Sequence, residues 1–351
     1  MSAQAIAPGG AVLAHATQAI AAGSKSFSAA ARLFDRETRA SAVMLYAWCR
    51  HCDDLIDGQE SGHYPDRPAP AGAGDGAVAL PAGEDRDAGL ARLAELEDRT
   101  RRACAGEPTA DPVFAGLQQV VRRHGIDLRY PLEHLAGFRM DVEGVRYGTL
   151  DDTLRYCWRV AGVVGVMMAQ VMGAVRGAAS SEAQAAVLDR ACDLGIAFQL
   201  TNIARDIVED ARIGRVYLPA DWLAAAGIAG ADADDAARAR AVQDPRHRDA
   251  LAGLAARLVD LAEPYYASAA VGLAALPWRS AWSIATARGV YRQIGWQVRA
   301  RGSRAWDARV STSRAAKLRW VAGGALAALA SRQASGGPAP QRDAALWTRP
   351  R

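Results

Sequence analysis

The sequence predicts an all-α protein, and three observations support this prediction. Ala is the dominant apolar residue, whereas Val, Ile and Thr are comparatively sparse. That composition favours helices, because β-branched side chains lose more rotamer freedom in a helix than Ala, Leu or Arg do. Apolar residues recur at helical spacing along most of the chain, and no segment shows the strict alternation of apolar and polar residues that indicates a half-buried strand.

The predicted helices follow one another with glycine or proline between them, where stop signals belong. Two helices are expected between Ala11 and Asp57, and Ser24-Lys25-Ser26 separates them. Helical periodicity resumes from Leu90 to about His124. Further helices are predicted over residues 131–140, 150–174, 181–210, 234–275, 278–300 and 313–332.

These helices are expected to form one domain over residues 15–332, preceded by an N-terminal extension, residues 1–14. Residues 59–88 are rich in Gly, Pro, Ala and Asp, which predicts a long flexible loop inserted in the domain rather than a boundary, since the chain before it is too short to bury a core alone. Residues 333–351 have a similar composition and are predicted to form a disordered tail.

Charge and cysteine content exclude some classes of protein. The net charge of +4, from 42 basic and 38 acidic residues, is too small to indicate nucleic-acid binding, and no basic run is interleaved with aromatic residues. Five cysteines, an odd number, and no recognisable signal peptide predict free thiols in a reducing, cytoplasmic compartment. No apolar run reaches the length of about 18 residues that a membrane-spanning helix needs.

Basic residues crowd one late stretch of the chain. They are Arg288, Arg292, Arg299, Arg301, Arg304, Arg309, Arg314, Lys317 and Arg319. They are interpreted either as the solvated face of a helix or as a surface that faces anions, namely phosphates or lipid head groups. The second interpretation predicts peripheral contact with lipids at the inner face of a membrane.

Two segments place aspartates on one face of a helix. In residues 46–58, Asp53 and Asp57 are four residues apart and share a face, and Tyr46, Arg50 and Asp54 form the neighbouring stripe.

The second segment, residues 198–219, repeats the arrangement about 150 residues later. Asn202, Asp206 and Asp210 share one stripe, with Gln199 one turn earlier, and the other faces carry apolar residues.

Carboxylates on an otherwise apolar helix are costly to bury unless a cation compensates them, and like charges four residues apart repel each other. Mg²⁺ removes both penalties, because it takes oxygen ligands from one or two carboxylates and from substrate phosphates. Two such helices that face each other would hold two or three ions around a diphosphate. The alternative is that the aspartates are solvated surface charges. The presence of two matched pairs makes this the weaker interpretation.

Nearby residues fit an anionic substrate. Arg50, Arg205 and Arg215 offer planar forks of donors for phosphate oxygens, although each could instead be an ion-pair partner of a neighbouring aspartate. Ser24, Ser26 and Phe27 stand where a helix is expected to begin, and free backbone N–H groups there bind anions. The alternative for this segment is an ordinary helix N-cap.

The two aspartate segments and four others resemble the squalene/phytoene synthase family in order and spacing. The segments are SKSF (24–27), YAWCRHCDDLIDG (46–58), FRMDVEG (138–144), LRYCWRVAGVVG (154–165), FQLTNIARDIVEDARIGRVYLP (198–219) and AEPYYASAAVGLAALPWRSAWSIATARGVYRQIG (262–295). The resemblance covers about residues 15 to 330 and points, within the family, to the bacterial phytoene synthases.

The resemblance implies a single-domain isoprenoid-synthase helical fold with a central cavity. It implies a Mg²⁺-dependent prenyltransferase of carotenoid biosynthesis that condenses two geranylgeranyl diphosphates head to head, through prephytoene diphosphate, to phytoene, with release of diphosphate. Mn²⁺ is expected to substitute for Mg²⁺, and NADPH is not expected. Membrane lipids and other enzymes of the isoprenoid pathway are the further partners it implies.

The family motifs also imply roles for individual residues. The implied metal ligands are Asp53, Asp57, Asp206 and Asp210, with Asp54 and Asn202 beside them. The implied substrate contacts are Ser24, Ser26, Phe27, Tyr46, Arg50, Gln199, Asn202, Arg205, Arg215, Tyr291 and Arg309. Arg50 and Tyr156 are expected to act in catalysis, Tyr156 by steering the cation or assisting proton transfer, and the alternative for Tyr156 is a core tyrosine with a satisfied hydroxyl.

Two features depart from the family pattern. The segment 59–88 is longer than expected and follows directly after the first aspartate motif, so it could affect how the cavity is covered. Cys49, His51 and Cys52 superficially suggest a metal site, but no second cysteine pair has suitable spacing, which favours packing or neutral thiols.

Other functions remain open from the residues alone. On the same fold, two farnesyl diphosphates would give presqualene diphosphate or dehydrosqualene. A chain-elongating or terpene-cyclising enzyme would share the aspartate helices but not the segment YCWRVAG (156–162). A non-catalytic helical assembly subunit with inert aspartates is the alternative from a different class.

Overall fold

Capped helices joined by short connections make up the structure, a computed structural model that describes residues 9–23, 30–57, 83–176, 179–333 and 340–351. In these ranges the chain forms helices and no strand, which confirms the all-α prediction. The helices are α1 (Gly9–Gly23), α3 (Arg36–Asp57), α4 (Gly83–Cys104), α5 (Pro112–His124), α6 (Arg129–Glu143), α7 (Leu150–Cys157), the π-helical turn η1 (Trp158–Gly162), α8 (Val163–Val171), α9 (Ser181–Arg212), α10 (Ala220–Ala225), α11 (Asp235–Gln243), η2 (Pro245–His247), α12 (Arg248–Gly272), η3 (Leu273–Ala275), α13 (Trp278–Arg301), η4 (Gly302–Arg304) and α14 (Arg314–Gln333).

Local sequence signals set several helix ends. The carboxylate of Asp111 accepts a hydrogen bond from Val113 N (2.8 Å) and Pro112 occupies the first turn of α5, as is typical of helix starts. Gly125 ends α5 with a φ of 63°, which a residue without Cβ adopts at no steric cost. Ser180 caps α9 by accepting from Ala183 N (3.2 Å).

The structure divides two segments that are each predicted as one helix. The π-helical turn η1 separates α7 from α8 within 150–174. Asp244-Pro245 separates α11 from α12 within 234–275, because proline lacks an N–H and Asp244 caps the next turn by accepting from Arg246 N (2.9 Å).

The loop predicted over residues 59–88 ends earlier in the chain than expected. α4 begins at Gly83, inside the segment 59–88. Residues 58–82, like residues 1–8, lie outside the described part of the chain, and the predictions made for them stay predictions.

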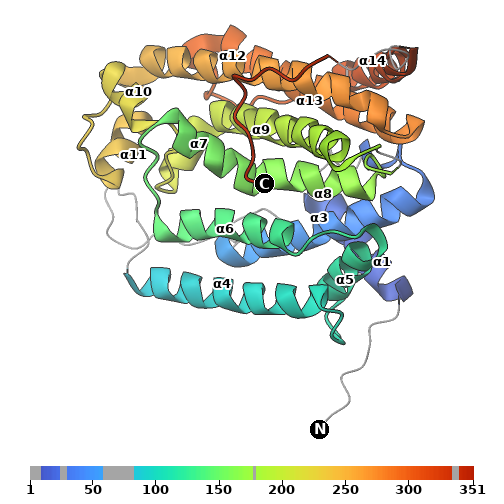
Figure 1. Ribbon diagram of the computed structural model, residues 1–351. Helices are drawn as coiled ribbons and strands as arrows, with labels where there is room; N and C mark the ends of the chain where they lie inside the picture. The colour runs from blue at the N-terminus through green and yellow to red at the C-terminus, as the bar shows by residue number, and fades with distance from the viewer. Residues whose placement is uncertain (1–8, 24–29, 58–82, 177–178, 334–339) are drawn as a thin grey trace.

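Helix α9 occupies the middle of the molecule, with α12 and α13 on one side and α8 on the other, followed by α6 and α3 and, at the far edge, α4 (Figure 1). Its backbone lies directly against the turn η1 and the first residues of α8. A Cβ on Gly195 would lie 2.3 Å from the carbonyl oxygen of Ala161, and one on Gly165 would lie 2.4 Å from the carbonyl oxygen of Ala191. These two glycines therefore permit a contact between backbones that no larger residue would allow.

No helix in the described ranges has the length and hydropathy that crossing a membrane requires.

The end of the chain packs onto α9, so the prediction of a disordered tail is wrong for residues 340–351. Arg342 Nη2 and Nε donate to the two carboxylate oxygens of Asp193 (2.7 and 2.9 Å), a side chain with no exposed surface. Arg349 Nε donates to Asp189 (2.9 Å), and both of these side chains are buried. Composition alone indicated disorder, because it contains no information on distant partners. The buried carboxylates that these arginines compensate lie 149 and 160 residues earlier in the chain.

Replacing Arg342 by Ala is expected to lower the free energy of unfolding by about 3 kcal/mol, because Asp193 would keep a buried charge without its main partner. Thermal or urea denaturation measures the change. Arg351→Ala is the matched control, since that arginine also contacts Asp189 but is 58% exposed, and its effect should stay below about 1 kcal/mol. Equal stability of the Arg342 variant and the unaltered protein would contradict this account of the tail.

Candidate active site

The first aspartate helix, α3, presents its predicted stripe to a cavity. Tyr46, Arg50 and Asp53 line this cavity. The guanidinium of Arg50 holds both neighbouring carboxylates, with Nη1 donating to Asp53 (2.7 Å) and Nη2 to Asp54 (2.5 Å). The two carboxylates are thereby compensated by one arginine on their own helix. Asp57 is the last residue of α3, and its side chain lies outside the described part of the structure.

The second stripe lies on α9 and extends from the cavity toward the C-terminal end of that helix. Gln199 and Asn202 line the cavity, and Asn202 Nδ2 donates to Gln199 Oε1 (3.3 Å). Asp206 and Asp210 follow at one-turn intervals on the same stripe. Asp206 accepts from Arg205 Nε (2.7 Å) on its own helix.

Arg309 reaches Asp206 from the segment between η4 and α14. One of its guanidinium nitrogens lies 3.3 Å from Asp206 and another lies 3.3 Å from Glu209. Its side chain is 60% exposed, so this contact is a bridge at the surface rather than a buried ion pair.

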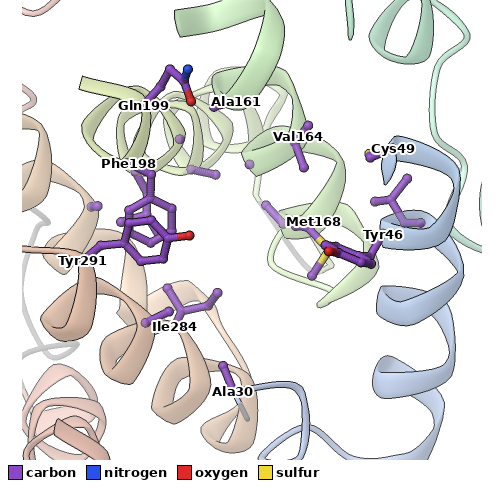
Figure 2. A pocket seen from close by; sticks show the side chains of 18 of the residues that line it. Ala30, Tyr46, Cys49, Ala161, Val164, Met168, Phe198, Gln199, Ile284 and Tyr291 are labelled. Carbon is purple, nitrogen blue, oxygen red and sulfur yellow. The ribbon is translucent and has the colours of Figure 1, made fainter. Parts of the chain in front are cut away.

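The cavity has a volume of about 560 Å³ and lies between α3, α8, α9 and α13. Figure 2 shows Tyr46 and Cys49 of α3 on one side, Phe198 of α9 and Tyr291 of α13 on the other, and Val164 and Met168 of α8 between them. Its lining follows α9 from Val187 to Asn202, a helical rise of about 22 Å. Polar residues gather toward the Asn202 end, and the rest of the lining is predominantly apolar.

The electrostatics of α9 fit a cation. Burial and the charge of Asp206 together raise the pKa of Asp210 well above its ordinary value, and the nearby Arg215 lowers it only in part. The side-chain oxygen of Asn202 is buried and has no hydrogen-bond partner among the described residues. An oxygen without a donor beside two repelling carboxylates is the kind of ligand set that a hard divalent cation stabilises.

A carboxylate that the motif spacing did not single out also lies in the cavity wall. Asp141, on α6, accepts hydrogen bonds from Tyr156 Oη (3.1 Å) and Tyr217 Oη (3.0 Å). The two phenol rings stack with their centroids 4.5 Å apart, and Tyr147 meets Tyr156 edge-on. Burial and the Asp141 charge raise the pKa of Tyr156 well above its ordinary value, so this phenol stays protonated.

The signal for Asp141 was present in the segment FRMDVEG, which carried the family resemblance. It was not recognised as a site residue because Asp141 has no acidic partner one turn away on α6, and its contacts come from residues 15 and 76 positions later.

The remaining predicted residues are placed as follows. Tyr291 lines the cavity and stacks on Phe198 (centroids 4.2 Å apart), and Arg215 also lines the cavity. Arg205 contacts Asp206 and is not part of the cavity lining. Ser24, Ser26 and Phe27 lie outside the described residues.

The cysteines do not form a metal site in the described part of the chain. Cys49 lines the cavity and Cys52 is fully buried, and burial raises the pKa of the Cys49 thiol to about 12. No group of three His, Cys, Asp or Glu side chains among the described residues is close enough to hold an ion by itself. Neutral, packed thiols therefore agree with the sequence interpretation of Cys49 and Cys52.

Known proteins share both the sequence and the fold. A 15-cis-phytoene synthase of Pantoea ananas is 50% identical over 339 residues, which are 97% of this chain and 98% of that protein. A crystal structure of a dehydrosqualene synthase superposes with a TM-score of 0.71 and 25% identity, over 90% of this chain and 96% of that one. A squalene synthase from Alicyclobacillus acidocaldarius, 23% identical, superposes with a TM-score of 0.63 over 83% and 94% of the two chains. These likenesses confirm the isoprenoid-synthase type of helical fold.

The family model for squalene/phytoene synthase matches residues 20–316, which include both aspartate stripes, the Asp141 segment and every residue of the cavity lining except Lys317 and Val321. This match and the half-identical relative place the chain in a family defined by the same motifs that its sequence displays. The chain belongs to the squalene/phytoene synthase family.

Proposed function

We propose that the chain is a phytoene synthase, which condenses two geranylgeranyl diphosphates head to head, through prephytoene diphosphate, to phytoene in carotenoid biosynthesis. The observation that carries this proposal is the 50% identity with a 15-cis-phytoene synthase over nearly the full length of both chains. Membership of the family makes the chain a prenyltransferase-type enzyme that acts on prenyl diphosphates.

Mg²⁺, for which Mn²⁺ would substitute, would be held by Asp53 and Asp57 on α3 and by Asn202, Asp206 and Asp210 on α9, with Asp54 beside them. When bound, the ions would neutralise the diphosphate and so favour its departure. The orphaned oxygen of Asn202 and the raised pKa of Asp210 support this assignment.

The arginines that now hold the aspartates would change partners when substrate arrives. Arg50 bridges Asp53 and Asp54, and Arg205 and Arg309 hold Asp206. Once ions compensate the carboxylates, these guanidinium groups are available to donate to diphosphate oxygens, in the geometry that Arg provides best. Ser24, Ser26, Phe27, Tyr46, Gln199, Arg215 and Tyr291 complete the proposed substrate contacts.

The apolar part of the cavity would hold the prenyl chains and keep water away from the allylic cation. Aromatic faces suit this task, because their quadrupole attracts a cation without reacting with it. Phe198, one turn before Asn202 on α9, stacks with Tyr291 of α13 at the wall of the cavity. The Tyr156 phenol, fixed by its hydrogen bond to Asp141, would guide the cation or the departing proton.

The proposed product is a hydrocarbon with little solubility in water, so the proposal includes peripheral contact with lipids at the inner face of a membrane and exchange of substrate with other isoprenoid enzymes.

Incubation of the purified protein with Mg²⁺ and geranylgeranyl diphosphate is expected to give a C40 hydrocarbon with the mass of phytoene and to need no NADPH. Mass spectrometry of the organic extract identifies the product, and EDTA should abolish its formation. Consumption of farnesyl diphosphate alone would instead indicate the dehydrosqualene-type reaction of a structural relative. No turnover of either substrate would favour a non-catalytic subunit.

Asp206→Asn is expected to lower kcat by about 10²–10³-fold, because it removes a charge that the ions require. The variant should remain folded, since the substitution also relieves repulsion with Asp210. Asp260→Asn is the matched control, because Asp260 likewise pairs with an arginine, Arg299 (2.5 Å), but lies on α12 outside the cavity lining. A fully active Asp206 variant would rule out its role as a metal ligand.

Tyr156→Phe and Tyr217→Phe are expected to be non-additive in the free energy of unfolding by about 1 kcal/mol, because both hydroxyls donate to Asp141 and neighbours that share a partner couple. Chemical denaturation of the two single variants and the double variant measures the coupling. Tyr265→Phe is the control partner, since its hydroxyl accepts from Trp347 N (3.1 Å) and shares no contact with Asp141, so its effect should add to that of Tyr156→Phe. Strict additivity for the Tyr156/Tyr217 pair would show that Asp141 does not join them.

A further inference from the structure

Helix α14 covers the cavity with one face. Lys317 and Val321 line the cavity, and a Cβ on Gly324 would lie 2.4 Å from Thr286 Oγ1 on α13. Trp282 Nε1 of α13 donates to the carbonyl oxygen of Val321 (2.7 Å). This side of α14 is therefore fixed against α13, over the apolar space that would hold the prenyl chains.

The opposite face of α14 is apolar as well, and it is exposed. Leu318, Leu326 and Leu329 are 70%, 69% and 50% exposed, more than any other large hydrophobic side chain in the described part of the protein. With the exposed Ala322 they fall within an arc of about 80° around the helix axis. A helix that is apolar on both faces is normally buried on both, so the outer face of α14 lacks a partner in the described structure.

Cations without counter-charges border this leucine stripe. The sequence of α14 contains Arg314, Lys317, Arg319 and Arg332 and no acidic residue. At helical spacing, Arg314 and Arg332 lie at one edge of the stripe and Arg319 at the other. None of these arginines forms an ion pair with a described residue, whereas on α13 Arg292 and Arg299 are neutralised by Glu263 and Asp260.

A tryptophan pair lies where α13 meets α14, and the ring of Trp320 packs against α13 at Gly289. Trp296, on α13, is 40% exposed, and its ring lies 6.5 Å from that of Trp320 on α14. Tryptophan is enriched at the boundary between lipid and water because it has a large apolar ring and a polar N–H.

We infer that the outer face of α14 is the surface on which the protein docks to an anionic lipid bilayer, with Leu318, Leu326 and Leu329 entering the acyl region and the flanking arginines contacting head groups. This inference rests on the proposed function, and it assigns the membrane contact to α14 and not to the paired arginines of α13. Because the same helix lines the cavity, a hydrocarbon product would leave beside α14 into the bilayer without crossing water.

Charge selects the bilayer over a second copy of the chain as the partner. A two-fold dimer through this face would place the patch against itself and bring its unpaired arginines together, which like charges oppose. Anionic head groups satisfy the same arginines while the acyl chains accept the leucines.

The full-length protein is expected to float with vesicles of mixed phosphatidylglycerol and phosphatidylcholine and to bind pure phosphatidylcholine vesicles much more weakly. Replacing Leu318, Leu326 and Leu329 together by Gln should reduce binding at least about 100-fold. Arg314→Gln and Arg319→Gln should each cost about fivefold on the anionic vesicles only. Leu13→Gln is the matched control, since this α1 leucine is 37% exposed and lies outside the stripe, and it should bind as the unaltered protein does.

Three outcomes would overturn the inference. They are no binding to either kind of vesicle, unchanged binding by the triple leucine variant, or a dimer in light scattering that this variant converts to a monomer while vesicles are not bound. Flotation needs no substrate, and product mass can be measured in detergent micelles, where the triple variant should keep its turnover. Failure of the docking surface and failure of the proposed reaction are therefore separate results.

Discussion

Buried negative charge on one central helix is the constraint on which much of this structure depends. Helix α9 carries carboxylates at both ends, Asp189 and Asp193 near its start and Asp206 and Asp210 near its end, and each needs compensation. At the start, arginines of the C-terminal tail supply a donor to each carboxylate oxygen of Asp189 and Asp193. At the end, arginines supply compensation only in part. The pKa of Asp210 therefore stays well above its ordinary value, and the side-chain oxygen of Asn202 has no hydrogen-bond partner among the described residues. The first end is thus suited to hold the fold and the second to accept ligands.

Sequence periodicity predicted the parts of the site that lie on single helices. Asp53, Asn202 and Asp206 could be recognised because their helical spacing places them in stripes that face one cavity or extend from it. Asp141 could not be recognised in this way, since its partners are tyrosines from other segments of the chain. The packing of the tail could not be recognised either, because Arg342 pairs with a carboxylate 149 residues earlier. The helices themselves were largely predictable from apolar spacing. Their interruptions were not, because the turn at Trp158–Gly162 depends on how the chain packs against α9.

The same arginines connect the resting structure with the proposed reaction. Arg50 and Arg205 each contact a carboxylate that is also a proposed metal ligand, so the site without substrate is already neutral in part. Such pairing avoids an uncompensated cluster of aspartates and keeps the guanidinium donors next to the proposed metal ligands. The apolar remainder of the cavity follows α9 away from these charges, which separates the polar chemistry of the diphosphate from the prenyl chains.

The glycine contacts set the spacing of α9 against η1 and α8, and all three elements line the cavity. Where Gly195 meets Ala161 and Gly165 meets Ala191, backbone lies against backbone, so a larger residue at either glycine would force the two helices apart. The opposite walls, α3, α13 and α14, present side chains such as Leu45, Ile284 and Val321 that can be shortened or enlarged. A change in the length of prenyl chain accepted, in evolution or by engineering, is therefore expected to come from side chains that face the cavity, such as Val164 and Met168 on α8 and those of the opposite walls, and not from the backbone spacing of α8 and α9.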